Sequence, residues 1–216
     1  IAEKLKQSPL VGNIGMGHTR WATHGKPDEI NAHPHRAGKT LLVHNGIIEN
    51  YELIRQKLLS KGIKIVSETD SELFGHLIEE LLAEGLEYVE AVRTAFLKLE
   101  GACSVVVLND NYPDTLIAIR NGTPLVAAYS SKAQGYFVAS DAQAIIEHSQ
   151  QVSYLEHGDM VVIRPSSMLV YSIHAPLSKS TEQKREPILL DWRVDSMNKD
   201  GFDHYMLKEI HEQPRA

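Results

Sequence analysis

The sequence has little of what several large classes of protein require. Its 216 residues include one cysteine, Cys103, so no disulfide can form within the chain, and this composition suits a reducing compartment such as the cytoplasm. No apolar run approaches the roughly eighteen residues of a membrane-spanning helix. No cluster of Lys and Arg occurs, and the net charge is −6. Since nucleic acids are bound by clustered basic side chains, these features argue against a membrane protein and a nucleic-acid-binding protein.

What remains is ordinary globular composition. Hydrophobic residues make up 43% and charged residues 23%, which is enough for one large domain or two small ones. The chain begins at Ile1 without an initiator methionine, and no signal peptide is visible, so we expect a fragment or a processed product.

The first half of the chain alternates predicted strands with predicted helices. Thr69 and Glu72 have the spacing of a capping box at the start of the second helix, and Gly62, Gly85 and Gly101 follow the three helical patterns as plausible ends. His44-Asn45-Gly46 is expected to form a tight turn after the first strand. The predicted strands are 40–43 and 63–66. The predicted helices are 49–61, one that starts near Asp70 and ends at Gly85, and a third after it that ends at Gly101, with Val89, Val92, Phe96 and Leu99 on its inward side.

The second half reads mainly as strands separated by turn residues. Asn, Asp, Gly and Pro cluster at 109–114 and 121–124, and such short connections make antiparallel hairpins. Helices followed by a run of hairpins indicate an α+β fold. Tyr205, Met206 and Ile210 are expected to form the apolar side of a last short helix. The predicted strands are 102–108, 115–119, 125–129, 136–139, 160–163 and 168–173, and the last helix is 203–213.

Polar side chains are dense between residues 18 and 50, where five of the eleven histidines lie. A metal site is one interpretation, but no histidine pair has the helical spacing of a His-Glu-x-x-His site, and Pro34 separates His33 from His35. Histidines that bond loop backbone are therefore the simpler interpretation, and we expect no metal and no cofactor.

Other residues of this region have two possible roles. Arg20 could bind a carboxylate bidentately beneath Trp21, or it could pair with a structural acid while Trp21 packs in the core. The Asn45 amide and the Gly46 N–H could form an oxyanion hole, although Asn-Gly is also a common hairpin turn. Asp70 could cap a helix or bind an ammonium group. The residue types alone leave these alternatives open.

Several long motifs, taken in order, resemble the class II, N-terminal-nucleophile glutamine amidotransferases, and in particular the glutaminase domain of glucosamine-6-phosphate synthases. The last of them resembles the segment that leads toward the sugar-phosphate isomerase domain of that family. The motifs are HTRWATHG at 18–25, NAHPH at 31–35, HNGIIENY at 44–51, SETDSE at 67–72 and DHYMLKEIHEQP at 203–214.

The resemblance implies a role for each matching residue. Arg20 would bind the α-carboxylate of glutamine and Asp70 its α-ammonium group. Asn45 and Gly46 would be the oxyanion donors, and His33 would support the site. The loop that closes over glutamine would carry Trp21, Thr23 and His24, with Trp21 also gating ammonia. These roles suit a zwitterionic amide substrate, which requires one cation, one anion and preorganised donors.

The resemblance also implies parts that this sequence lacks. The nucleophile of the family is an N-terminal cysteine whose own α-amine is the general base. Cys103 lies in an apolar run without a free amine, and we expect it to pack in the core. The chain alone is therefore expected to be inactive, and a non-catalytic glutamine-binding module is the alternative.

The implied fold is a four-layer αββα sandwich of antiparallel sheets that lacks its N-terminal strand. Residues 1–202 would be the amidotransferase domain, and residues 203–216 would begin a linker toward an isomerase domain that uses fructose 6-phosphate. The full-length protein would be a cytoplasmic homodimer that hydrolyses glutamine and transfers the ammonia.

Overall fold

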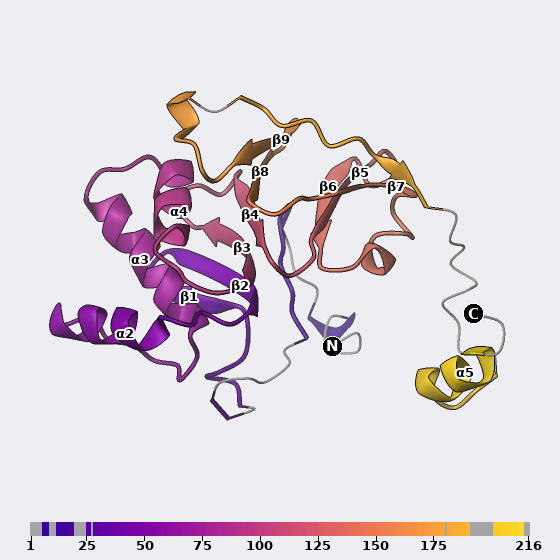
Figure 1. Ribbon diagram of the computed structural model, residues 1–216, viewed down its shortest axis with the longest axis horizontal. Coiled ribbons are helices and arrows are strands. Elements are labelled where there is room, and N and C mark those ends of the chain that lie inside the picture. The colour runs from indigo at the N-terminus through magenta and orange to yellow at the C-terminus, as the bar shows by residue number, and fades with distance from the viewer. Residues whose placement is uncertain are drawn as a thin grey trace.

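The computed structural model describes residues 6–8, 12–19, 25–26, 28–179, 181–190 and 201–213. In this part of the chain, a six-stranded and a four-stranded antiparallel sheet are stacked, and helices cover the outer face of the larger sheet (Figure 1). No helix in these ranges has both the length and the apolar character needed to cross a bilayer.

The larger sheet has the strand order β1-β2-β3-β4-β8-β9, and the smaller sheet has the order β10-β7-β5-β6. The larger sheet consists of β1 (His35–Ala37), β2 (Thr40–Gly46), β3 (Cys103–Asn109), β4 (Leu116–Asn121), β8 (Asp159–Arg164) and β9 (Ser167–Ser172). The smaller sheet consists of β5 (Val126–Ser130), β6 (Gly135–Ala139), β7 (Gln151–Tyr154) and β10 (Ile188–Leu189).

The chain passes between the two sheets more than once. It leaves the larger sheet after β4, builds β5 to β7, returns for β8 and β9, and ends in β10 of the smaller sheet. The expected hairpin across residues 121–124 is therefore wrong, because β4 pairs with β3 and β8 and not with β5. The turn residues there carry the chain from one sheet to the other.

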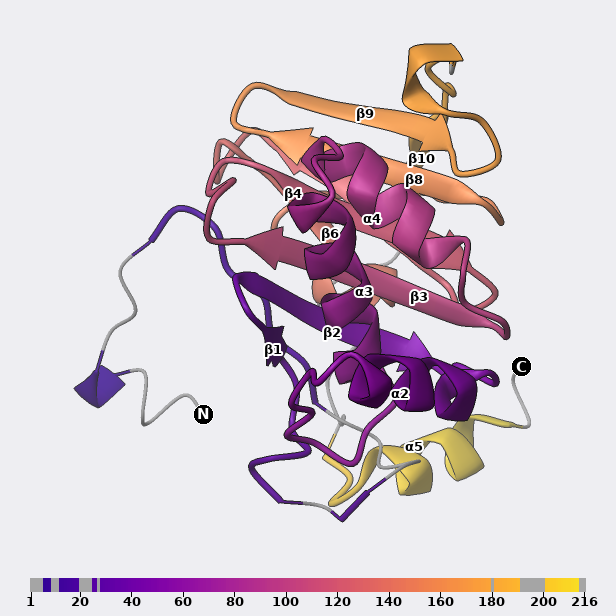
Figure 2. The same cartoon turned by 90° about the vertical axis from the view of Figure 1, so that its left-hand side faces the viewer.

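Three helices cover the outer face of the larger sheet: α2 (Tyr51–Ser60), α3 (Ser71–Ala83) and α4 (Tyr88–Phe96) (Figure 2). The fully buried face of α3 includes Leu73, Phe74 and Ile78, and each such side chain contributes roughly 1.5–3 kcal/mol of burial free energy. A Cβ on Gly75 would lie 2.7 Å from the Ala37 Cβ. The glycine thus lets α3 lie close to β1 and β2, which brings the start of α3 near the end of β2.

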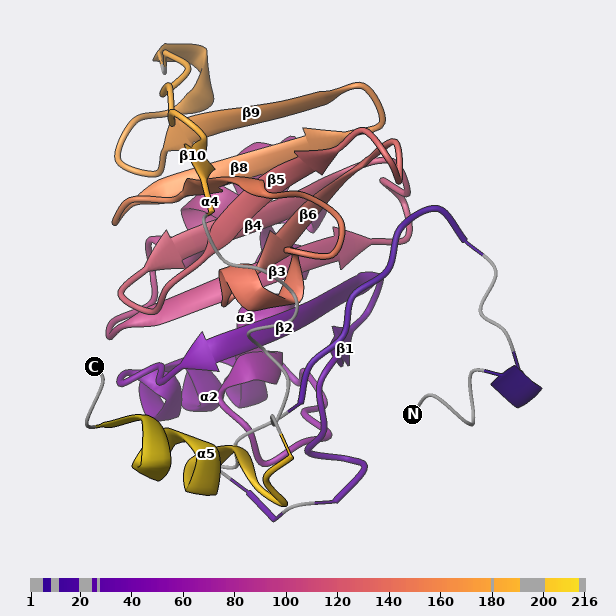
Figure 3. The ribbon, with the colours of Figure 1, turned by 90° about the vertical axis from the view of Figure 1, so that its right-hand side faces the viewer.

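The smaller sheet lies against the face of the larger sheet opposite the helices (Figure 3). A second apolar core fills the space between the sheets, and a third lies on the outer face of the smaller sheet. The expected α+β sandwich of two antiparallel sheets is confirmed. In the described residues, the 3-10 turn η1 (Ala142–Ala144) contributes to the fourth layer, where Ile145, Ile146 and Leu190 are also buried.

Two expectations about the segment before α3 are wrong. Residues 63–66 form no strand, because Ile63 and Ile65 pack against the helical core rather than in a sheet. Glu72 does not close a capping box with Thr69. Its carboxylate accepts hydrogen bonds from the backbone N–H groups of Val66, at 2.8 Å, and Ser67, so it fixes the segment that leads into Asp70.

Replacing Glu72 with Gln is expected to destabilise the fold in a pH-dependent way. Burial raises the pKa of the Glu72 carboxyl, but hydrogen bonds from His76, Ser67 and Val66 outweigh burial and lower the pKa from 4.5 to about 2. Because the folded pKa is depressed, this stabilisation is complete above pH 4.5 and is lost as the pH falls through about 2. We expect a loss of about 2 kcal/mol at neutral pH.

Urea unfolding of E72Q and wild type between pH 7 and pH 2 measures this difference. Glu84→Gln is the control, because Glu84 is exposed and its replacement is expected to change stability little at any pH. A difference between E72Q and wild type that stays constant over the whole range would contradict the prediction.

Three strands of the structure are short, and the last helix is near the end of the chain. Strands β1, β7 and β10 were not expected, because segments of two to four residues are too short to show alternation. The helix expected at 203–213 is α5 (Tyr205–Glu212). Its apolar residues Tyr205, Met206 and Ile210 are exposed.

Candidate functional site

The candidate site lies at the end of β2. Asn45 and Gly46 do not form the expected hairpin turn, because β2 continues through them and pairs them with Ser104 and Cys103 of β3. Gly46 has a φ of +128°, and a Cβ there would lie 2.1 Å from the carbonyl oxygen of Ala102. Only glycine fits at this position without moving the backbone of β3.

The Gly46 N–H points away from β3. The next residue, Ile47, donates its N–H to the Ala102 carbonyl at 3.2 Å, and the N–H groups of successive residues in an antiparallel strand point to opposite sides. On that other side the neighbour is β1, which pairs with β2 only as far as Leu42. Among the described strands, none pairs with Gly46 from that side, so its N–H is a suitable donor for a ligand.

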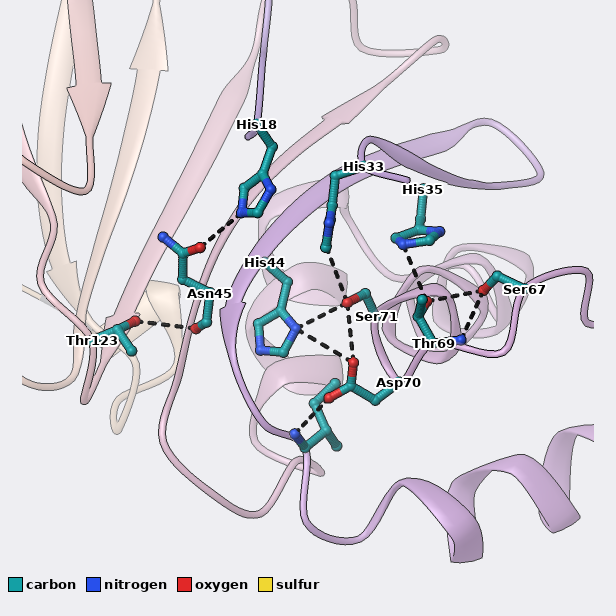
Figure 4. Close-up of polar contacts among 11 residues, drawn as sticks. His18, His33, His35, His44, Asn45, Ser67, Thr69, Asp70, Ser71 and Thr123 are labelled. Carbon is teal, nitrogen blue, oxygen red and sulfur yellow. Dashed lines mark hydrogen bonds and ion pairs between the residues drawn. The ribbon is translucent and has the colours of Figure 1, made fainter. Parts of the chain in front are cut away.

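The Asn45 side chain has one end engaged and one end available (Figure 4). The His18 Nε2–H donates to Asn45 Oδ1 at 2.8 Å. No hydrogen bond joins Asn45 Nδ2 to another described residue, and Figure 4 shows this nitrogen pointing away from His18. The Thr123 hydroxyl donates to the Asn45 carbonyl oxygen at 3.1 Å.

Asp70 lies at the start of α3, and its carboxylate points to the end of β2. It accepts a hydrogen bond from the Ile48 N–H at 2.8 Å, and Asp70 Oδ1 lies 3.8 Å from His44 Nδ1. The expected helix cap is absent, since its side chain caps no α3 N–H group. The Asp70 carboxylate bonds to Ile48, which is two residues after Gly46 in the chain. This position is compatible with the other expectation, that Asp70 binds an ammonium group.

A network of histidines and hydroxyls surrounds Asp70. The Ser71 hydroxyl donates to Asp70 Oδ1 at 3.2 Å and therefore accepts from the His44 Nδ1–H at 3.0 Å and the His33 Nε2–H at 3.2 Å. The His33 ring also packs against His18, with ring centroids 4.3 Å apart. His33 thus contacts the site through Ser71 and His18, and the sequence had not singled out either of these partners.

The structure brings together part of the expected site. Asn45, Gly46, Asp70 and His33 lie within one connected group of contacts. Arg20, Trp21, Thr23 and His24 lie outside the described residues. The sequence did not predict that Thr123 bonds to Asn45 or that Ser71 bonds to Asp70. Its one indication was that Thr123 lies in the turn segment 121–124 and Ser71 in the motif at 67–72.

Cys103 is fully buried at the start of β3, as expected. Burial, together with the nearby Asp70 carboxylate, raises the pKa of its thiol to about 12. Because the thiolate is the reactive form, this thiol is a poor nucleophile. In the described residues, no group of three His, Cys, Asp or Glu side chains converges as metal ligands would.

Labelling of Cys103 by a disulfide reagent at pH 8 is expected to be at least about 10³-fold slower in the folded chain than in urea, since both its access and its thiolate fraction are reduced. Absorbance of the released thiol follows the reaction. Rapid labelling of the folded chain would contradict the buried position.

The arrangement suits a substrate that carries both an amide and a charged amine. Two N–H donors at the end of β2 can stabilise negative charge on a carbonyl oxygen under attack. The Asp70 carboxylate beyond them supplies a negative charge for an ammonium group. A strand end, a helix start and a loop from β4 to β5 meet here, so the site depends on the fold as a whole.

Comparison with known proteins shows the family of the chain. The family model for the glutamine amidotransferase domain matches residues 18–147, and the chain belongs to this family of glutamine amidotransferases. It is 46% identical over 222 residues to glutamine–fructose-6-phosphate aminotransferase [isomerizing] of Thermosynechococcus vestitus, covering 99% of the chain. It is 41% identical to that of Clostridium tetani and 40% identical to that of Escherichia coli K12, over 100% of the chain. The chain spans 34% of the length of each of these relatives.

Solved structures show the same fold. Glutamine phosphoribosylpyrophosphate amidotransferase from B. subtilis, solved with ADP and GMP, superposes with a TM-score of 0.59 at 23% identity. The match covers 72% of this chain and 34% of the other. A structure described as the allosteric regulatory enzyme of purine biosynthesis gives a TM-score of 0.55 at 22% identity.

Proposed function

We propose that this chain is the glutamine-hydrolysing domain of a glutamine–fructose-6-phosphate aminotransferase. The observation that carries the proposal is the 40–46% identity along nearly the whole chain to three enzymes of that name. The position of Asn45, Gly46 and Asp70 at one end of β2 supports it, because hydrolysis of an amino-acid amide requires N–H donors for an oxyanion and an anion for the ammonium group.

In this proposal each residue has one task. Asn45 Nδ2 and the Gly46 N–H donate to the oxyanion that forms when a thiolate attacks the glutamine amide. Asp70 binds the α-ammonium group, Arg20 binds the α-carboxylate, and His33 supports the site through Ser71. Trp21, Thr23 and His24 cover the bound glutamine. The thiolate is that of the N-terminal cysteine implied by the family resemblance, and burial and a raised pKa make Cys103 unsuited to this task.

The proposal extends to the complete protein. Residues 1–202 form the amidotransferase domain, and residues 203–216 begin a linker to an isomerase domain that binds fructose 6-phosphate. That enzyme is a cytoplasmic homodimer, and it combines the ammonia with fructose 6-phosphate to make glucosamine 6-phosphate. No cofactor takes part in the proposed hydrolysis.

Glutamate release from glutamine by the complete natural protein tests the proposal. We expect release that an electrophilic glutamine analogue abolishes, with the label on an N-terminal cysteine in peptide mass spectra. Glutamine binding without release would instead support a non-catalytic module. Glutamate release with no glucosamine 6-phosphate on addition of fructose 6-phosphate would indicate a different acceptor.

Replacing Asp70 with Asn is expected to raise the KM for glutamine about 10- to 100-fold, since a charge-assisted hydrogen bond contributes about 1.5–3 kcal/mol. The neutral amide can still accept from the Ile48 N–H, so the fold is kept. Asp110→Asn is the matched control, because Asp110 is an exposed partner of Arg36. Steady-state kinetics of both variants measure the effect, and an unchanged KM in D70N would exclude Asp70 as the ammonium partner.

A further inference from the structure

The two proposed oxyanion donors belong to adjacent residues, and each is oriented by a different neighbour. The Asn45 amide can face a substrate with either its nitrogen or its oxygen, and only the nitrogen can stabilise an oxyanion. The His18 Nε2–H lies 2.8 Å from Asn45 Oδ1. An amide oxygen can only accept, so Nε2 carries the ring proton in this contact, and this tautomer retains the oxygen at the His18 side and leaves Nδ2 for the ligand.

The His18 ring is itself supported. It packs against the His33 ring at a centroid distance of 4.3 Å, and the His33 Nε2–H donates to the Ser71 hydroxyl at 3.2 Å. Ser71 is buried at the start of α3. The direction of the Asn45 amide is therefore coupled to the helix that also carries Asp70.

Thr123 acts on the second donor. Its hydroxyl donates to the Asn45 carbonyl oxygen at 3.1 Å. That oxygen and the Gly46 N–H belong to the same planar trans peptide unit, where C=O and N–H point in opposite directions. A hydrogen bond that fixes the carbonyl therefore also fixes the direction of the Gly46 N–H.

The loop that carries Thr123 is anchored to the same strands. The Ser104 hydroxyl donates to the Thr123 carbonyl oxygen at 2.7 Å, and the Asn121 side chain donates to the Gly101 carbonyl at 3.3 Å. A Cβ on Gly122 would lie 2.6 Å from the Ala102 Cβ, so the loop lies directly on β3. Thr123 thus has a fixed base from which to orient the peptide.

We propose that His18 and Thr123 are positioning residues that aim the two oxyanion donors, His18 through the Asn45 side chain and Thr123 through the Asn45–Gly46 peptide. The inference rests on the proposed glutamine hydrolysis. Neither residue needs to touch the substrate for this role. Their loss therefore affects the transition state, in which the oxyanion forms, more than the binding of glutamine.

Matched variants of the complete natural protein test the proposal. Thr123→Val keeps the shape and removes the hydroxyl, whereas Thr123→Ser keeps the hydroxyl. We expect T123V to lower kcat for glutamate release at least about 10-fold with little change in KM, because misplaced catalytic groups cost up to about 10²-fold, and T123S to restore most of the rate. Thr94→Val is the control, since Thr94 lies on α4 away from the site.

His18 is tested in the same assay. His18→Gln keeps a side chain that can donate to Asn45 Oδ1, and it is expected to retain more of kcat than His18→Leu, whose side chain cannot donate. Equal kcat values in T123V, T123S and wild type, or a rise in KM with kcat unchanged, would overturn the inference while glutamine hydrolysis by the wild type stands. A wild-type protein that releases no glutamate would overturn the proposed function itself. Thermal unfolding midpoints of all variants separate a loss of rate from a loss of fold.

Discussion

Replacing Asn45 with Ala is expected to lower kcat for glutamine hydrolysis by about 10²–10³-fold, the usual cost of removing one oxyanion donor. The change should leave KM nearly unchanged, because the donor acts on charge that develops only in the transition state. Asn45 is half-buried. Within the described residues, its side chain makes one hydrogen bond, which is with His18. The fold should therefore survive the substitution, and steady-state glutamate release measures the effect.

Two companion variants make this prediction sharper. Asn45→Asp keeps the size of the side chain but places a second acceptor, and a negative charge, where the oxyanion forms. It is expected to be no more active than N45A. Asn111→Ala is the control, since the Asn111 side chain is exposed in the connection after β3. A kcat for N45A within about twofold of wild type, far from the usual effect of a lost donor, would rule out Asn45 as an oxyanion donor.

Replacing Gly46 with Ala is expected to destabilise the protein by about 2–6 kcal/mol. The first cause is backbone strain at a φ of +128°, which costs about 1–3 kcal/mol for a residue other than glycine. The second is the added methyl group, which would lie 2.1 Å from the Ala102 carbonyl oxygen and 2.8 Å from the Cys103 Cα. Overpacking of this kind costs about 1–3 kcal/mol when the neighbours have to move.

Gly62→Ala separates the two causes. Gly62 also has a positive φ, +76°, but a Cβ there would meet no atom within 4 Å. This control is expected to cost only about 1–2 kcal/mol, the strain of the left-handed conformation. Urea unfolding followed by circular dichroism compares the two variants. Equal losses in G46A and G62A would show that the close approach to β3 contributes nothing.

The same close approach links stability to function at this end of the sheet. A Cβ at Gly46 or Gly122 would clash with Ala102, and a Cβ at Gly101 would lie 2.4 Å from the Ile47 carbonyl oxygen. These glycines allow three strand ends to meet backbone to backbone. The result is a rigid base for Asn45 and Thr123, which suits donors that have to be in place before the reaction begins.

Much of the fold was predictable from local pattern. The helices at α2, α3 and α4 and the strands at β3 to β6, β8 and β9 all have periodic apolar residues of sufficient length. The buried position of Cys103 followed from its apolar neighbours. The family followed from several long motifs in order, and the match of residues 18–147 to the glutamine amidotransferase domain confirms it.

Local pattern failed where a contact distant in sequence decided the conformation. Asn-Gly at 45–46 has the composition of a hairpin turn, yet pairing with Ser104 and Cys103 keeps it in a strand. Residues 63–66 alternate like a strand, yet the Glu72 carboxylate takes the Val66 N–H that a sheet would have used. The loop at 121–124 has the residues of a hairpin and joins two sheets instead.

The sequence by itself thus determined the family, the α+β class and the residue types at the proposed oxyanion and ammonium positions. Only the tertiary structure decided how those residues are oriented. The direction of the Asn45 amide depends on His18, 27 residues earlier, and the direction of the Gly46 N–H depends on Thr123, 78 residues after Asn45. Such orientation arises from packing between distant segments, and no local preference of the chain encodes it.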